Sequence, residues 1–135
     1  MRDSALARID YVGLADRAAA PAGALAFGQR RMVELARALA TEPDLLLLDE
    51  PASGLNMSET DELGQLIEKI RDSGVTVLLV EHDMSLVMNI SDEILVLDNG
   101  ATIAEGSPLA IQNDPNVIAV YLGSDFKHAS ASQKP

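Results

Sequence analysis

Cysteine and tryptophan are absent from this 135-residue sequence, and aromatic residues make up only 3% of it. Without cysteine the chain has no disulfide framework and no metal site built on thiolates. The two tyrosines and two phenylalanines are scattered along the chain. They do not form the closely spaced aromatic set on which nucleic-acid bases stack.

Long apolar runs are missing as well. The longest are "LLLL" and "VTVLLV", far below the roughly 18 to 20 residues that span a bilayer. The N-terminal stretch "MRDSALARID" lacks the apolar centre of a signal peptide. We therefore expect a soluble, cytoplasmic protein without direct membrane insertion.

Positive charge is scarce. Ten lysine and arginine residues stand against 21 aspartate and glutamate residues, which gives a formal net charge of -11. A field of this sign repels phosphate backbones and anionic lipids, so binding of nucleic acid is not expected. The hydrophobic share of 47% is enough for one core of ordinary size, and thus for one domain or part of one.

The spacing of apolar residues predicts alternating helices and strands. Residues 4–14, 28–40, 58–74 and 83–89 have helical character, with Ser58 and Asp61 expected to form a capping box. Residues 45–48 and 75–80 are apolar on both faces, as in strands buried in a parallel sheet. "EILVLDNGATIAEG" predicts a hairpin around Asn99-Gly100, and Ser107-Pro108 and Asp114-Pro115 each predict the start of a short helix.

Strands that alternate with amphipathic helices indicate an α/β fold, in which ligands bind at the carboxyl ends of parallel strands. Asp49 and Glu50 follow the first strand, and His82 follows the second in "EHD". A carboxylate there can hold a hard cation, and its neighbour can polarise a water molecule. Solvated acids at a turn and a surface histidine remain the plainer interpretation of these residues.

A possible anion site lies upstream, where Gly28 and Gln29 open the arginine-bearing helix. The first turn of a helix presents unpaired backbone N–H groups and the positive end of the helix dipole. Most helix N-termini bind only water, so the order and spacing of this segment relative to "LLLLDEP" and "EHD" decide its meaning.

That order resembles the ATP-binding cassette (ABC) ATPases, which power membrane transport. "LAFGQ" at 25–29 resembles the signature motif, "LLLLDEP" at 45–51 the Walker B strand with its following glutamate, "ASGLN" at 52–56 the D-loop, and His82 in "VEHDM" the switch histidine. The resemblance covers nearly the whole chain. The signature, the D-loop and the ending "NVIAVYLG" are most similar to ATPase subunits of bacterial branched-chain amino acid importers.

The resemblance implies a role for each site residue. Asp49 would hold Mg²⁺, Glu50 would act as general base or orient the attacking water, and His82 would contact the γ-phosphate of ATP. On the opposite side of a composite site, Phe27, Gly28 and Gln29 would close on the ATP of a second ATPase subunit. The D-loop residues Ser53, Gly54 and Asn56 would cross the dimer seam.

Two positions depart from the family pattern. Ala26 stands where the signature usually has serine, and Asn56 where the D-loop usually has aspartate. Loss of the serine hydroxyl removes one hydrogen-bond donor to phosphate.

The phosphate loop is missing altogether. No G-x-x-x-x-G-K-[ST] motif occurs, and Lys69, Lys127 and Lys134 stand in no glycine-rich loop. The resemblance then implies the C-terminal part of a P-loop NTPase fold of the ABC type: parallel strands with flanking helices, a C-terminal β-hairpin and short helices. Residues 1–124 would be a partial nucleotide-binding domain and residues 125–135 a polar tail. Alone, the chain should neither bind ATP tightly nor hydrolyse it.

In the family, the strand that carries the phosphate loop lies between the strands corresponding to residues 75–80 and 94–97. Its absence would leave unpaired strand edges, and buried backbone groups do not stay unpaired without a large cost. We expect these two strands either to pair with each other or to associate with another chain.

Two functions remain open from the sequence. The first is the ATP-hydrolysing subunit of an importer, held at the inner membrane through permease subunits. The second is a non-catalytic regulatory or interaction module derived from such an ATPase. The transported solute is chosen by other subunits, so the sequence does not define it.

Overall fold

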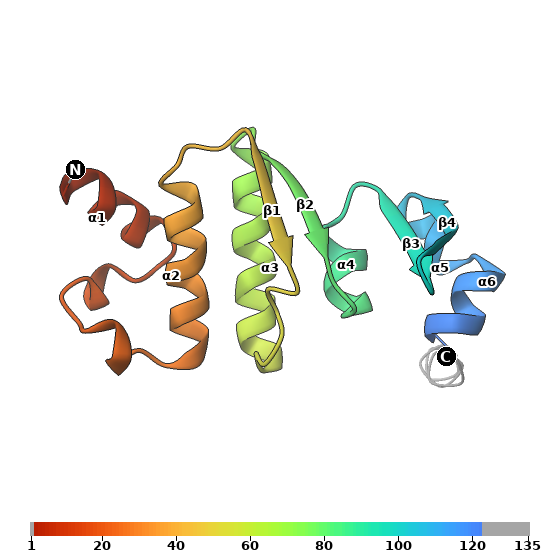
Figure 1. Cartoon of the computed structure of the whole chain (residues 1–135), viewed down its shortest axis with the longest axis horizontal. Coiled ribbons are helices and arrows are strands. Elements are labelled where there is room, and N and C mark those ends of the chain that lie inside the picture. The colour runs from red at the N-terminus through yellow and green to blue at the C-terminus, as the bar shows by residue number, and fades with distance from the viewer. Residues whose placement is uncertain (1, 123–135) are drawn as a thin grey trace, which may run out of the picture. The chain divides into compact units, whose positions relative to one another are not determined.

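A computed structural model describes residues 2–122 of the chain. It contains two compact units (Figure 1). The first ends at Leu86 and the second begins at Val87. Each unit has its own sheet and its own buried residues, so they are described in turn.

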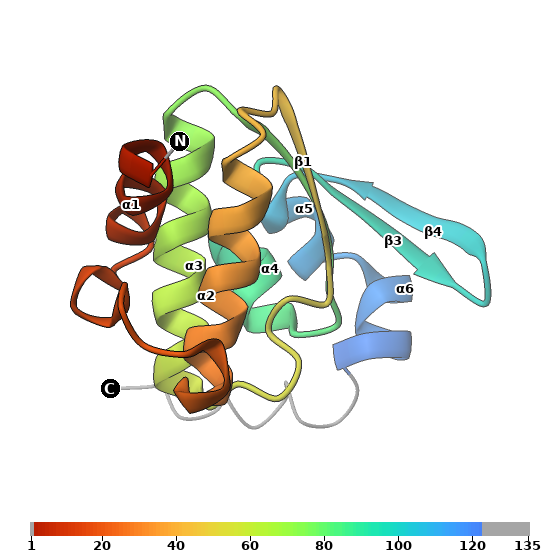
Figure 2. The same cartoon turned by 60° about the vertical axis from the view of Figure 1, so that its left-hand side comes forward.

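Helices make up most of the first unit. They are α1 (Arg2–Tyr11), the 3-10 turns η1 (Ala15–Arg17) and η2 (Ala22–Ala24), α2 (Phe27–Leu39) and α3 (Met57–Asp72). Helices α2 and α3 run side by side (Figures 1 and 2). Their apolar residues, including Leu35, Leu39, Leu63, Ile67 and Ile70, are buried, which confirms the helical spacing read from the sequence.

Strands β1 (Leu45–Asp49) and β2 (Thr76–Val80) form a parallel pair, as predicted. Helix α3 connects them and contacts β2. The prediction that both faces of this sheet are buried is wrong for the described residues. Leu46 is buried, but Leu45, Leu47, Leu78 and Val80 on the other face are 53–65% exposed. In residues 2–122 the helices α2 and α3 do not cover that face.

The capping box of helix α3 begins two residues before the expected one. Asn56 is the N-cap, and its side chain accepts a hydrogen bond from the Glu59 N–H at 2.9 Å. The Glu59 carboxylate accepts one from the Asn56 N–H at 3.0 Å. The predicted box at Ser58 and Asp61 is therefore wrong, because extended backbone at Asn56 (φ −77°, ψ 175°) places the helix start at Met57.

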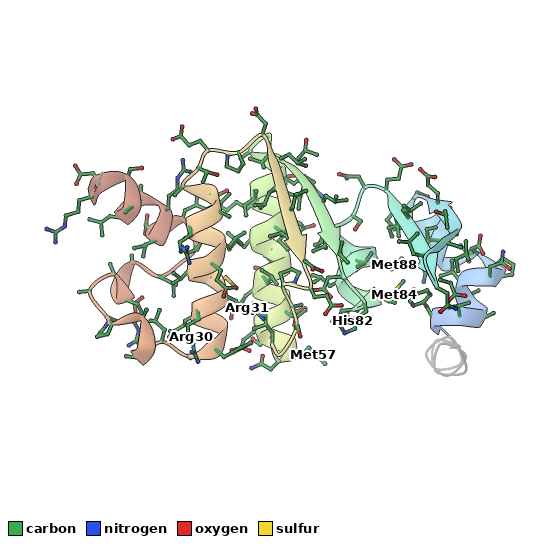
Figure 3. The ribbon with its side chains drawn as sticks, viewed as in Figure 1. Arg30, Arg31, Met57, His82, Met84 and Met88 are labelled. Atoms are coloured by element: carbon green, nitrogen blue, oxygen red, sulfur yellow. The ribbon has the colours of Figure 1, made fainter. Side chains whose placement is uncertain are left out.

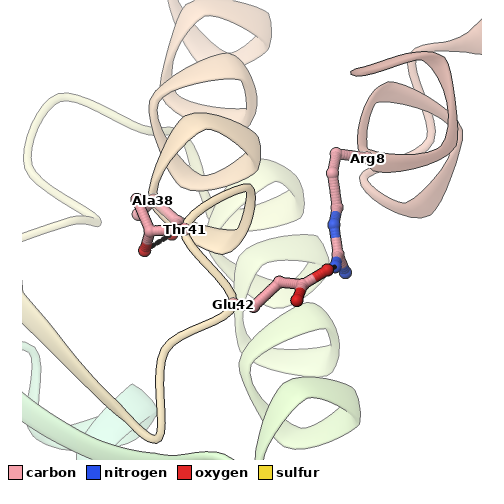
Figure 4. A network of polar contacts seen from close by, with 4 residues as sticks. All are labelled: Arg8, Ala38, Thr41 and Glu42. Atoms are coloured by element: carbon pink, nitrogen blue, oxygen red, sulfur yellow. Dashed lines mark hydrogen bonds and ion pairs between the residues drawn. The ribbon is translucent and has the colours of Figure 1, made fainter. Parts of the chain in front are cut away.

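Helix α1 is attached to the rest of the first unit through polar contacts. It contacts α2 but buries none of its own residues. The Arg8 guanidinium lies 3.3 Å from Glu42, just after α2, and the Thr41 hydroxyl donates to the Ala38 carbonyl at the end of that helix (Figure 4). The Lys69 ammonium lies 4.0 Å from the ring centroid of Tyr11. These contacts hold α1 without extending the core.

The second unit is a hairpin with short helices. Its elements are α4 (Met84–Ile90), which crosses the boundary between the units, β3 (Ile94–Asp98), β4 (Ala101–Gly106), α5 (Pro108–Gln112), α6 (Pro115–Val117) and the turn η3 (Ile118–Leu122). Strands β3 and β4 are antiparallel. Their turn has positive φ at Asn99 (48°) and Gly100 (80°), as a tight hairpin requires.

The predicted caps of the second unit are confirmed. The Ser107 hydroxyl accepts from the Ala110 N–H, and the Asp114 carboxylate accepts from the N–H groups of Asn116 and Val117. The Tyr121 hydroxyl donates to the Leu97 carbonyl. Ile111 and Val117 are fully buried, and helices α5 and α6 contact β4.

Strands β2 and β3 do not pair. Residues 2–122 form two separate two-stranded sheets, β1–β2 and β3–β4. Of the two expected alternatives, pairing of residues 75–80 with residues 94–97 is not found among residues 2–122. Strand β3 pairs along one edge with β4, as the predicted hairpin around Asn99-Gly100 requires, and within residues 2–122 its other edge has no strand partner. Association of these strands with another chain remains a prediction. The polar tail predicted at 125–135 lies outside the described residues.

Candidate functional site

The acidic pair after β1 lies at the edge of the sheet where both parallel strands end. Asp49 is the last residue of β1 and is in register with Val80, the last residue of β2. Glu50 has φ +46°, a left-handed conformation that non-glycine residues rarely adopt. Its N–H still donates to the Val80 carbonyl at 2.8 Å. The turn therefore begins at Glu50 while the residue remains joined to β2.

Glu50 and His82 come together at this edge. The Glu50 Oε1 lies 3.5 Å from the His82 Nδ1, although the residues are far apart in the sequence. Both side chains are accessible, with 51% and 70% of their surface exposed, and Figure 3 shows His82 just beyond the end of β2. Parallel strands end at the same edge, so this approach is the one that the sequence predicted.

Glu81 is a residue at this edge to which the sequence reading gave no role. One of its carboxylate oxygens accepts a hydrogen bond from the Ala52 N–H at 2.8 Å, and the other accepts one from the His82 N–H at 3.2 Å. The signal was present in "EHD", where an acid stands directly before the histidine at the end of a strand. We name Asp49, Glu50, Glu81 and His82 the strand-end cluster.

The segment that resembles the signature motif opens α2. Ala26 is the N-cap and offers no side-chain cap. Arg30 is the first residue whose N–H bonds back to the Ala26 carbonyl. The N–H groups of Phe27, Gly28 and Gln29 therefore belong to the orphan donors of the first helical turn. The Gln29 side-chain oxygen accepts from the Ala26 N–H at 3.0 Å.

The signature-like segment (residues 25–29) packs against the D-loop-like segment (residues 52–56) and the start of α3. A methyl group on Gly54 (φ +81°) would lie 2.9 Å from the Phe27 ring. One on Gly28 would lie 2.7 Å from the Glu59 carboxylate. The Arg31 guanidinium lies over the Phe27 ring, with its Cζ atom 5.1 Å from the ring centroid. Close approach and positive φ together favour glycine at position 54, whereas at position 28 the Glu59 side chain would have to move.

The predicted site residues fall into two groups. The structure brings Glu50 and His82 together beside Asp49, and it brings Phe27 into contact with Gly54. Within residues 2–122, no hydrogen bond joins Gly28 or Gln29 to Glu50 or His82. Asn56 uses its side chain to cap α3, and the Ser53 N–H closes the turn on the Glu50 carbonyl at 3.1 Å.

The donor set at the strand-end cluster fits Mg²⁺ held partly by a nucleotide. Among residues 2–122 no group of three or more histidine or acidic side chains could enclose a metal ion. Magnesium ions are commonly held by one or two carboxylates together with water and substrate phosphates, rather than by a cage of protein ligands. Asp49 supplies a carboxylate at the right edge of the sheet, so its chemistry fits this mode.

Two family models match segments of the chain. Residues 2–53 match the family model described as "ABC transporter", and residues 101–127 match that of the "Branched-chain amino acid ATP-binding cassette transporter". A crystal structure of the ADP conformation of an ATP-binding cassette of an ABC transporter matches 90% of this chain and 50% of its own, with a TM-score of 0.81 and 30% identity. The chain belongs to the ABC transporter ATPases, with their P-loop NTPase fold.

Within that family the chain is similar to proteins of branched-chain amino acid transport. It is 53% identical over 116 residues to the high-affinity branched-chain amino acid transport ATP-binding protein BraF of Pseudomonas aeruginosa. It is 48% identical over 122 residues to LivG of Escherichia coli, which carries the same description. These matches cover 85% and 90% of this chain.

The chain spans about half the length of these curated relatives, 46% of BraF and 48% of LivG. No helix among the described residues has the length and apolar character needed to cross a membrane. Both relatives are named as ATP-binding proteins of transport systems.

Proposed function

We propose that the chain supplies the hydrolytic edge and the signature segment of an ATP-hydrolysing subunit in a branched-chain amino acid importer. The observation that carries the proposal is the 3.5 Å approach of Glu50 and His82 at the carboxyl ends of β1 and β2. The similarity to BraF and LivG supports the substrate class.

Three residues of the strand-end cluster have distinct chemical roles in this proposal. Asp49 would hold Mg²⁺ with the nucleotide, and the bound ion would neutralise charge on the phosphate groups. Glu50 accepts a hydrogen bond from the attacking water and takes its proton. When both imidazole nitrogens carry a proton, His82 can donate to Glu50 and to a γ-phosphate oxygen at the same time. The exposure of Glu50 and His82 leaves room for these ligands.

The second group of residues acts on the ATP of a second ATPase subunit. The unpaired N–H groups of Phe27, Gly28 and Gln29 face the phosphates, aided by the positive end of α2. Ser53, Gly54 and Asn56 lie at the seam between the two subunits, and the contact of Gly54 with Phe27 links the two segments of one chain. Each ATP site is completed by two subunits.

The phosphate loop comes from outside these 135 residues, since the sequence contains none. Permease subunits connect the assembled ATPase to the membrane, at its cytoplasmic side. In this proposal residues 1–124 belong to one nucleotide-binding domain, and residues 125–135 follow it as a tail.

A chimaera tests the proposed function. The segment of BraF that matches this chain is replaced by the corresponding 116 residues, and ATP hydrolysis is measured beside unaltered BraF. We expect an active chimaera, in which Glu50→Gln lowers kcat about 100- to 10,000-fold, the range of a general base. Glu62→Gln, on the exposed surface of α3, is the matched control and should leave kcat unchanged. A chimaera that folds and binds Mg-ATP but hydrolyses none would refute the proposal.

Calorimetry on the 135-residue chain alone gives the complementary result. We expect no heat of Mg-ATP binding, even at protein concentrations that would reveal millimolar affinity, because the phosphate cradle is missing. Glu50→Gln should behave in the same way. Stoichiometric binding by the chain alone would show that other residues cradle phosphate, and the division of the site between polypeptide segments would be wrong.

A further inference from the structure

We propose that Glu81 is a positioning residue, which sets the separation of Glu50 and His82 without touching the nucleotide. The inference rests on the proposed function, because it assigns a purpose to that separation. Its structural content can nevertheless be measured in the absence of any nucleotide.

Glu81 joins the two segments that carry the reacting groups. Its carboxylate accepts the Ala52 N–H, two residues after Glu50, and the N–H of His82 itself. Ala52 lies in the turn after β1, whereas Glu81 and His82 directly follow β2. One side chain therefore connects the backbone beyond one strand to the backbone beyond its neighbour.

The turn that Glu81 holds is a tight one. The left-handed backbone at Glu50 and the bond from the Ser53 N–H to the Glu50 carbonyl fix its shape. Ala52 is buried within it, with 9% of its surface exposed. The turn between Glu50 and Ala52 has little conformational freedom. A displacement of the Ala52 amide would therefore move Glu50 as well.

Carboxylate chemistry explains why an acid suits this position. An ionised carboxylate is an acceptor at both oxygens, so it can satisfy two N–H groups at once. Hydrogen bonds to a charged acceptor are also stronger than neutral ones. Glutamine offers a single acceptor oxygen, and alanine offers none. Glu81→Gln should therefore leave one of the two amides without its hydrogen bond, and Glu81→Ala should leave both without one.

Backbone amide exchange in the isotopically labelled 135-residue chain tests the proposal. Glu81→Ala should raise the exchange rates of the Ala52 and His82 amides about tenfold or more, as expected for loss of bonds to a charged acceptor. Glu81→Gln should retain protection at one of the two amides. Glu62→Gln, an exposed acid on α3, should change neither rate. Protection of the α3 amides should stay constant in all variants.

A second readout reports the position of the reacting groups. The nuclear Overhauser effect between the His82 ring and the Glu50 side chain should be present in the wild type and in Glu62→Gln. It should weaken in Glu81→Gln and be lost in Glu81→Ala. A residue that merely stabilised the strands would lower protection across β1, β2 and α3 together and would leave this effect in place.

Several outcomes would overturn the proposal. Unchanged exchange at Ala52 and His82 in a folded Glu81→Ala variant is one, and uniform loss of protection without a selective change at these amides is another. If Glu81→Ala does not fold, Glu81→Gln decides, and wild-type protection of both amides there rejects the idea. A chimaera that folds and binds Mg-ATP but hydrolyses none refutes the ATPase function alone, whereas these amide rates bear on Glu81 alone.

Discussion

The parallel pair β1–β2 and the hairpin β3–β4 connect their two strands in different ways. Both sheets bury one face, with Leu46 in the first and Ile94 and Val96 in the second. The hairpin closes through two turn residues, Asn99 and Gly100. The parallel pair needs the whole of α3 to return the chain to the same end.

The direction of the strands decides where chemistry can gather. In the parallel pair both strands end at one edge, so Glu50 and His82 meet although α3 and β2 lie between them in the sequence. In the hairpin, β3 ends where β4 begins, so that edge carries a turn. A site composed of strand-end residues is therefore available in the first unit, and the second unit contributes packing around Ile111 and Val117.

The largest expected effects concern the independence of the two units. Ile70→Ala and Ile111→Ala remove equal volumes from the two buried cores, and each should cost about 2–5 kcal/mol. Native-state amide exchange should show Ile70→Ala weakening α3, β1 and β2, and Ile111→Ala weakening β3, β4 and α5. The exposed residues Met57 and Leu109 provide the controls as alanine variants. Loss of amide protection in both units from either substitution would contradict the independence of the two units.

A smaller effect separates two glycines with nearly equal backbone conformations. Gly54 (φ +81°) and Gly100 (φ +80°) should each lose about 1–2 kcal/mol of stability on substitution by alanine, because the left-handed conformation crowds a Cβ atom. Only Gly54→Ala meets a neighbour, the Phe27 ring. Aromatic NMR signals of Phe27 should shift in Gly54→Ala and stay in place in Gly100→Ala. Identical spectra would mean that the ring does not depend on Gly54.

The smallest effect compares the helix caps of the two units. Asn56→Ala and Ser107→Ala each remove a side-chain acceptor from a helix start, worth about 1 kcal/mol. Asn56→Ala should cost more, because the loss of its cap also loosens the backbone N–H at residue 56, which donates to the Glu59 carboxylate. Urea unfolding followed by circular dichroism measures both. An equal or reversed order would show that the Glu59 bond contributes nothing.

Local patterns in the sequence predicted most elements of the fold. Helical spacing gave α2 and α3, the apolar runs gave β1 and β2, and Asn99-Gly100 gave the hairpin. Adjacent carboxylates after one strand and a histidine after the next also predicted the edge where Glu50 and His82 meet. Each of these features depends on neighbours in the sequence or on the general geometry of parallel strands.

Features that depend on contacts between distant segments were not predictable. The Glu81 carboxylate accepts a hydrogen bond from the Ala52 N–H, and the Phe27 ring lies against Gly54. No periodicity in the sequence connects the members of either pair. The exposed face of β1 and β2 was missed for a related reason. Apolar residues indicate that a surface is suited to burial, but they do not specify which segment covers it.

Helix α1 should detach before the rest of the first unit unfolds. Since it buries none of its own residues and is held by the Arg8–Glu42 and Lys69–Tyr11 contacts, its detachment exposes little apolar surface. Segments of this kind open locally long before the whole domain unfolds. Trypsin should therefore cleave after Arg2 and Arg8 before it cleaves within α2 or α3, while the sheet edge that carries Glu50 and His82 persists through those early cuts.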